Sequence, residues 1–147
     1  MPKSKRKLPR REEVFVKSLM YHGFRKTHQR ENLKYAYGYI IAATKYEDGG
    51  GTDFWIKMPR DARLFPIQVT QRGVRLYRKH HRASETQLAE FIEHSEKRVR
   101  TKRMWCKRYG IAFVLVRDHG GRTTNPTLAW GDIKALRYAI AHLRRWL

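Results

Sequence analysis

The segment from Ser84 to Val116 constrains the fold of this chain most strongly, because it predicts a long helix followed at once by a buried strand. Ser84 and Gln87 have the spacing of a capping box, which favours a helix start at that point. Gly110 is well placed to end the helix. The apolar run Ile111–Val116 that follows is rich in β-branched and aromatic residues and predicts a central strand. One face of the helix is expected to carry Leu88, Ile92, Ser95 and Val99.

The middle of the chain predicts an antiparallel hairpin. Three glycines at 49–51 precede a strand-forming stretch at Asp53–Met58, and a turn-forming stretch follows at residues 59–63. Leu64–Thr70 is then expected to return as the second strand. Pro66 cannot donate to the hydrogen-bond ladder, so it belongs near the start of that strand or at a bulge.

Helices are expected at both ends of the chain. Glu12–Tyr21 carries an apolar face and stops near Gly23. A second helical segment is expected from Gln29 or Glu31 to Tyr37, after which residues 39–44 form either a short strand or a continuation of the helix. A short strand at Thr127–Trp130 leads to a last helix capped by Asp132, with an apolar stripe of Ile133, Leu136, Ile140, Leu143 and Leu147. This order predicts an α/β fold, a mixed central sheet flanked by helices.

Charge is the main compositional constraint on function. The 147 residues contain 33 Lys and Arg against 13 Asp and Glu, a formal net charge of +20. Such a field attracts polyanions, and the excess is larger than the magnitude of roughly 2–8 that suffices to keep a small domain in solution. Residues 1–11 are expected to form a basic flexible arm and residues 12–147 a single domain. A single cysteine, Cys106, excludes an internal disulfide framework and a cysteine-based zinc site.

A possible site lies on the predicted hairpin. Asp53 opens the first strand and Gln68 stands fifteen residues later on the second, followed by Val69 and Thr70. This pattern, with the helix–strand order after it, resembles the PD-(D/E)XK restriction-endonuclease-like superfamily. In that family an Asp begins one strand, and an acid or Gln, any residue, and then Lys lie on the next. Taken by themselves, Asp53 is also compatible with a turn cap and Gln68 with a partner for a neighbouring main-chain group.

The resemblance implies a site that binds Mg²⁺ or Mn²⁺ and hydrolyses phosphodiester bonds. Asp53, the Gln68 side chain and the main-chain carbonyl of Val69 would be metal ligands, since Mg²⁺ prefers oxygen. The metal would polarise the phosphate and lower the pKa of a bound water. The family also has a Glu on the helix before the hairpin. Glu31 is our first choice for it, and the competing acids are Glu12, Glu13 and Glu47.

The motif departs from the family at Thr70, which stands where Lys is expected. A hydroxyl carries no charge and cannot replace an ammonium group in steadying developing negative charge. Lys57 lies on the Asp53 side of its strand and is one candidate substitute, and Arg72 on the Gln68 side is another. Asp53, Gln68, Thr70, Lys57 and Glu31 are therefore the expected catalytic residues.

Cations near the hairpin and on the long helix are expected to contact phosphates. Such contacts supply affinity and salt dependence without base specificity. Tyr77 and Trp105 are candidates for stacking on an unpaired base, although Trp105 is equally compatible with core packing. The expected nucleic-acid-binding residues are Arg72, Arg75, Arg78, Lys79, Arg82, Lys102 and Arg103.

These features predict a DNA- or RNA-binding protein of nuclease-like fold, a metal-dependent hydrolase if its site is active. Two alternatives stay open: a binding module on the same fold whose hydrolytic site has decayed, and a ribosome-associated or RNA-packaging basic protein. The resemblance also implies a possible homodimer. No apolar run approaches the ~20 residues of a membrane span, and residues 1–11 do not resemble a signal peptide. We therefore expect no membrane partner and an intracellular protein, cytoplasmic or nucleoid-associated.

Overall fold

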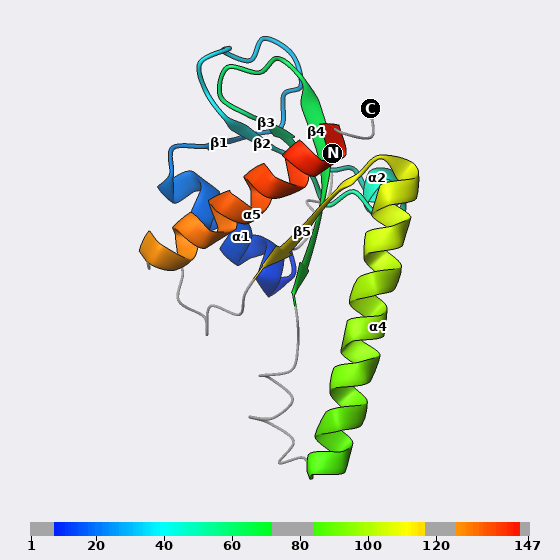
Figure 1. Ribbon diagram of the computed structural model, residues 1–147. Coiled ribbons are helices and arrows are strands. Elements are labelled where there is room, and N and C mark those ends of the chain that lie inside the picture. The colour runs from blue at the N-terminus through cyan, green and yellow to red at the C-terminus, as the bar shows by residue number, and fades with distance from the viewer. Residues whose placement is uncertain (1–7, 72–83, 117–125, 145–147) are drawn as a thin grey trace, which may run out of the picture.

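The computed structural model describes residues 8–71, 84–116 and 126–144, which form an α/β fold around a mixed sheet (Figure 1). Within these residues the sheet has five strands in the order β1-β2-β3-β4-β5. The inner pairs β2–β3 and β3–β4 are antiparallel, whereas the outer pairs β1–β2 and β4–β5 are parallel. The strands are β1 (Arg25–Thr27), β2 (Tyr39–Ala42), β3 (Phe54–Lys57), β4 (Leu64–Gln71) and β5 (Ala112–Val116).

Helices cover both faces of this sheet. α1 (Arg10–Tyr21) and α5 (Pro126–Arg144) pack against each other and against one face, and α4 (Glu85–Tyr109) lies on the other side (Figure 1). The short α2 (Lys45–Gly49) joins β2 to β3 beside the C-terminal end of α4. Within the described residues, no helix is long and apolar enough to cross a membrane.

The hydrophobic core fills the layer between the sheet and the α1–α5 pair. Burial of this apolar surface is the main force that holds the two helices to the sheet. Their inward stripes meet alternate residues of the strands, which is why one face of β3 and β4 is apolar and the other is free for polar groups. The helices contribute Phe15, Val16, Leu19, Ile133, Leu136 and Ile140, and the strands contribute Phe54, Ile56, Ile67, Val69 and Val114.

Local sequence signals correctly predict several elements. Ser84 and Gln87 form both hydrogen bonds of a capping box at the start of α4, and Gly110 ends that helix in the left-handed conformation, with φ +69°. β3 and β4 form the expected antiparallel hairpin, with Phe54 opposite Ile67. Residues 39–42 form a strand, which decides between the two alternatives left by periodicity.

The second expected helix, from Gln29 or Glu31 to Tyr37, is wrong, because residues 28–38 form a loop. Side chains satisfy main-chain groups that a helix would otherwise pair. The Nζ of Lys57 donates to the carbonyl oxygens of Tyr35 and Tyr37, at 2.9 and 2.7 Å. The main-chain N–H of Lys34 donates to the hydroxyl of Tyr39 at 3.1 Å.

The expected strand at Thr127–Trp130 is also wrong, because α5 already begins at Pro126. Ala129 is buried in the core and extends the apolar stripe of α5 by one turn. Asp132 consequently lies inside the helix, where it is buried, and does not cap it. Arg10 and Arg11 likewise belong to α1, so that helix begins within the range expected for the basic arm; residues 1–7 lie outside the described part of the chain.

Two further expectations need correction. β5 lies at the edge of the described sheet, where we expected a central strand. Its apolar character reflects cover from α5 on one face and α4 on the other. Ile92 is exposed although it was assigned to the inward face of α4. Leu88, Ser95 and Val99 of the same stripe are buried, so Ile92 lies at the margin of the inward face.

Candidate active site

Asp53 lies immediately before β3 and is held against β4 by two hydrogen bonds. Its main-chain N–H donates to the Ile67 carbonyl at 2.8 Å, and its Oδ2 accepts the main-chain N–H of Val69 at 2.8 Å. Phe54 and Ile67 are paired and face the core, so the flanking residues Asp53 and Gln68 point to the opposite face, toward α4. The hairpin thereby brings the two expected ligand residues together.

The loop before Asp53 is fixed by its glycines. Gly51 has φ +100°, a conformation that side chains rarely adopt, and a Cβ there would lie 3.1 Å from the indole nitrogen of Trp105. That nitrogen donates to the carbonyl oxygen of Gly50 at 3.3 Å. The loop is therefore seated directly on the last turns of α4.

A cavity of about 330 Å³ opens between this loop, β4 and α4. It combines the acidic end of β3 with a basic and aromatic wall from α4. Arg11 enters from the first turn of α1, where its Nε donates to the Val69 carbonyl at 3.3 Å. The residues that line the cavity are Arg11, Asp48, Gly49, Gly51, Asp53, Gln68, Lys102, Trp105 and Cys106.

Glu12 supplies a second buried carboxylate close to the cavity. It begins the inward stripe of α1 that continues through Phe15 and Leu19, and it is 1% exposed. Arg11 Nη2 lies 3.5 Å from Glu12 Oε2. The negative charge of Glu12 acts on Asp53 and disfavours its ionisation. Of the competing acids for the helix position, Glu12 is the one whose charge acts on Asp53.

The environment of Asp53 raises its pKa to about 7. Burial is the main cause, because it removes water from the carboxylate, which is 4% exposed. The hydrogen bond from the Val69 N–H acts in the opposite direction. The negative charge of Glu12, a hydrogen bond with the Asp48 side chain and the charge of Asp48 all raise the pKa further. Carboxyl groups crowded in this way favour a bound cation or a shared proton.

Among the described residues that line the cavity, Lys102 is the one lysine. Burial lowers its pKa, the charges of Arg11 and Arg98 lower it further, and the charge of Asp53 raises it. Burial raises the pKa of Cys106 to about 11, and the Asp53 charge adds to that effect. Cys106 is therefore a neutral thiol at physiological pH and a poor nucleophile.

The donors around Asp53 fit a hard divalent cation only with help from water or substrate. Within the described residues, no three His, Cys, Asp or Glu side chains are grouped so that they could hold a metal ion. Magnesium commonly binds through one or two carboxylates with water and phosphate oxygens completing its shell. Gln68 Nε2 donates to the Val69 carbonyl at 3.2 Å, and the oxygen of the same amide is the atom that could serve as a metal ligand.

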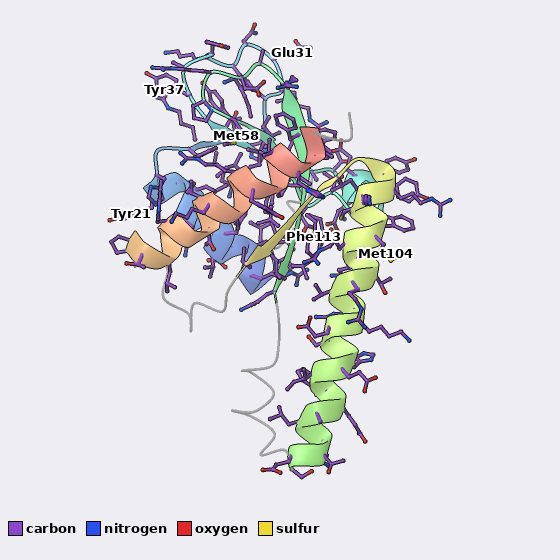
Figure 2. The ribbon with its side chains drawn as sticks, viewed as in Figure 1. Tyr21, Glu31, Tyr37, Met58, Met104 and Phe113 are labelled. Atoms are coloured by element: carbon purple, nitrogen blue, oxygen red, sulfur yellow. The ribbon has the colours of Figure 1, made fainter. Side chains whose placement is uncertain are left out.

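Several expected site residues are placed elsewhere. Glu31 is exposed in the loop between β1 and β2, at the edge of the molecule (Figure 2). It is not on a helix, so it does not serve as the helix acid. Lys57 lies four residues along the strand from Asp53, a span of roughly 13 Å. Its Nζ is engaged by three main-chain carbonyls, those of Tyr35, Tyr37 and Met58. Lys57 therefore has a structural role and does not replace the motif lysine.

Some of the remaining expected site residues lie in the described part of the chain, and others lie outside it. Thr70 is buried, and its hydroxyl has no hydrogen-bond partner within the described residues. Arg103 is exposed on α4, with its guanidinium carbon 5.3 Å from the ring centroid of Phe113 on β5, a residue labelled in Figure 2. Five expected phosphate-binding residues lie outside the described part of the chain: Arg72, Arg75, Arg78, Lys79 and Arg82.

Sequence reasoning missed the position of Asp48 and the part that Lys102 plays in the cavity. Lys102 occupies a buried stripe of α4 with Ser95, Val99 and Cys106, at steps of 4, 3 and 4 residues. A lysine inside such a stripe is a usable signal, as is an acid at the head of one, the case of Glu12. Asp48 has no comparable signal, because its position depends on the path of α2.

Comparisons with protein-family models, with curated proteins and with solved structures find no match to this chain.

Proposed function

We propose that this chain is a nucleic-acid-binding protein with a restriction-endonuclease-like core, and that the cavity around Asp53 hydrolyses phosphodiester bonds with Mg²⁺ or Mn²⁺. The observation that carries the proposal is that Asp53 and Gln68 line one cavity and that the charge of buried Glu12 acts on Asp53. They come from the helix before the hairpin and from its two strands, the three places where the family has its acidic or amide ligands. The element order α1, β1, β2, α2, β3, β4, α4, β5, in which β1 and α2 are short, supports the same assignment.

Each residue would have a distinct part in the reaction. Asp53 and Glu12 would hold the cation, and the Gln68 amide oxygen would complete the protein's share of its shell. The bound metal would polarise the phosphate and lower the pKa of a water. The Val69 carbonyl was expected as a further ligand, but Arg11 and Gln68 both donate to it, so it orients these side chains instead.

Lys102 would supply the positive charge that Thr70 cannot. It reaches the same cavity from α4, where its ammonium group would stabilise negative charge that develops on the phosphate. Arg11 on the opposite wall would assist in binding the phosphate. The net charge of +20 would add long-range attraction for nucleic acid.

The test is cleavage of labelled linear, branched and single-stranded DNA and RNA with Mg²⁺ or Mn²⁺, by the wild type and by Asp53→Asn. We expect cleavage by the wild type and a loss of at least 100-fold in the variant. Asp61→Asn is the matched control, since Asp61 lies in the β3–β4 turn and pairs with Arg63 at 3.2 Å. Equal cleavage by Asp53→Asn would rule out this site.

Tight, salt-sensitive binding without any cleavage by the wild type would favour a binding module that has lost its hydrolytic activity. Buried Thr70 in place of the motif lysine is the observation that favours this second function. Supplying a lysine by Thr70→Lys would then be the natural attempt to restore cleavage. Binding that hardly changes with salt would argue against phosphate contacts in either case.

A further inference from the structure

Two exposed aromatic rings lie at the mouth of the Asp53 cavity. Trp105 is 48% exposed and Tyr109 is 52% exposed, and their ring centroids are 4.4 Å apart at an interplanar angle of 44°. Both belong to the last turns of α4: Trp105 directly follows Met104, which Figure 2 labels on that helix, and Tyr109 lies about one turn further on. Trp105 also lines the cavity itself. An apolar surface of this size left open to water next to a polar cavity needs an explanation.

The indole is held in one orientation. Its Nε1 donates to the Gly50 carbonyl at 3.3 Å, and Gly51 packs so closely that a Cβ would lie 3.1 Å from the same nitrogen. Tyr109 packs against the indole, with ring centroids 4.4 Å apart, and the Arg108 guanidinium carbon lies 5.6 Å from the Tyr109 centroid. Because the ring is already fixed, little conformational entropy is lost when a flat partner stacks on it.

The charge around the rings selects the partner. The last turns of α4 carry several cations, of which Lys102 and Arg108 lie three residues from Trp105 and so share its side of the helix. A neutral or cationic apolar partner gains nothing from that field, whereas a polyanion with flat rings satisfies both features. The nearby cations of α4 are Lys102, Arg103, Lys107 and Arg108.

We propose that Trp105 and Tyr109 form a stacking platform for an unpaired nucleobase, next to the phosphate that enters the Asp53 cavity. A base inside a duplex is stacked on its neighbours and cannot lie on these rings. The substrate is therefore a strand with at least one unpaired nucleotide at the reaction site, such as a single strand, a flap or a branch. This inference rests on the proposed function, because it assigns the substrate class of the same site.

The test is equilibrium binding in EDTA, so that cleavage does not contribute. The probes are a 12-nucleotide oligo(dT), an abasic 12-mer with the same phosphates, and a blunt 12-base-pair duplex. The wild type should bind oligo(dT) more tightly than the abasic strand by roughly 5- to 100-fold, the range for one base–aromatic stack. Trp105→Leu should abolish that difference without changing abasic or duplex binding, and Trp105→Phe should keep most of it.

Trp130→Leu is the matched control. Trp130 is 41% exposed on α5, with Lys134 Nζ and the Arg137 guanidinium carbon at 5.7 and 5.2 Å from its ring, so it is another exposed tryptophan among cations. The platform would be overturned if Trp105→Leu left the affinity for oligo(dT) unchanged. It would also be overturned if Trp130→Leu reduced that affinity as much as Trp105→Leu does. Equal wild-type binding of oligo(dT) and the abasic strand would also overturn it while leaving the cleavage site standing. If the wild type binds none of the probes, the platform and the proposed function are both rejected.

Discussion

The carboxylate of Asp53 accepts the main-chain N–H of Val69 at 2.8 Å, and this bond ties the loop before β3 to the strand that carries Gln68. The bond favours the ionised carboxylate, whereas burial and the charges of Glu12 and Asp48 oppose ionisation and raise the pKa of Asp53 to about 7. The folded chain therefore holds an acid that is easily neutralised near physiological pH. Removing that charge or compensating it should stabilise the fold.

Asp53→Asn should stabilise the metal-free protein at high pH. The amide oxygen keeps the bond to Val69, while the charge is lost. Unfolded Asp ionises near pH 4 and folded Asp53 near 7, so wild-type stability declines as pH rises through this window and levels off above it. Thermal unfolding in EDTA should show no difference between variant and wild type near pH 4. At pH 8 the variant should be more stable by roughly 1–4 kcal/mol. A gap that does not depend on pH would contradict the raised pKa.

Mg²⁺ should stabilise the wild type at pH 7 through the same carboxylate. A ligand at one hundred times its Kd raises the free energy of unfolding by about 2.7 kcal/mol. Binding should also release protons, since Asp53 is partly protonated near pH 7 without metal. Thermal shift and proton release measured by calorimetry in buffers of different ionisation enthalpy check both effects. Asp53→Asn should lose the two responses, and Asp61→Asn should keep them.

The parts of the fold that could be predicted are those that neighbouring residues determine. The capping by Ser84 and Gln87 and the helix end at Gly110 follow from spacings of a few residues, and the β3–β4 hairpin follows from two strand-forming stretches joined by a short turn. The loop at residues 28–38 could not be predicted in this way. Its main chain is satisfied by Lys57, which comes from a strand some twenty residues later.

The candidate site likewise has one part that the sequence predicts and another that it does not. Asp53 and Gln68 lie on one hairpin, so parity of the strand faces brings them together. Lys102 lines the cavity from α4, and the charge of Glu12 acts on Asp53 from α1. Both residues come from helices distant in sequence, so their positions depend on how α1 and α4 pack on the sheet. Glu31 is expected at the site because it begins the helical segment predicted nearest the hairpin, and the structure has a loop in place of that segment.

Lys102→Ala should lower single-turnover cleavage by about 100-fold or more, the usual size of a lost transition-state charge contact. Affinity for single-stranded DNA should change by less than about threefold, because many other cations contribute to binding. Lys107→Ala is the control on the same helix, exposed and absent from the cavity lining. Equal losses of cleavage in the two variants would show that Lys102 contributes only general charge.

Thr70→Val should leave cleavage unchanged and stabilise the protein. The Thr70 side chain is buried, and its hydroxyl lacks a hydrogen-bond partner within the described residues, so it loses its hydration without compensation. Valine has nearly the same shape and carries no polar atom. We expect a gain of about 1 kcal/mol in denaturant unfolding. A large loss of cleavage with the fold intact would instead assign the hydroxyl to the reaction.

Glu47→Gln should weaken the loop behind the site in a pH-dependent way. Glu47 accepts hydrogen bonds from Arg30 Nη1, the Trp55 indole and the Thr44 N–H, each at 2.9 Å. The hydrogen bond from Arg30 is the main cause that lowers its pKa to about 2. The stability that the ionised group contributes is present above its ordinary pKa of 4.5 and is lost as pH falls toward 2. The cost of the variant should be about 1 kcal/mol at pH 7, since solvent screens the partly exposed pair, and should shrink below pH 4. Urea unfolding of both proteins between pH 2 and 7 measures the difference, and a cost as large at pH 2 as at pH 7 would contradict the lowered pKa.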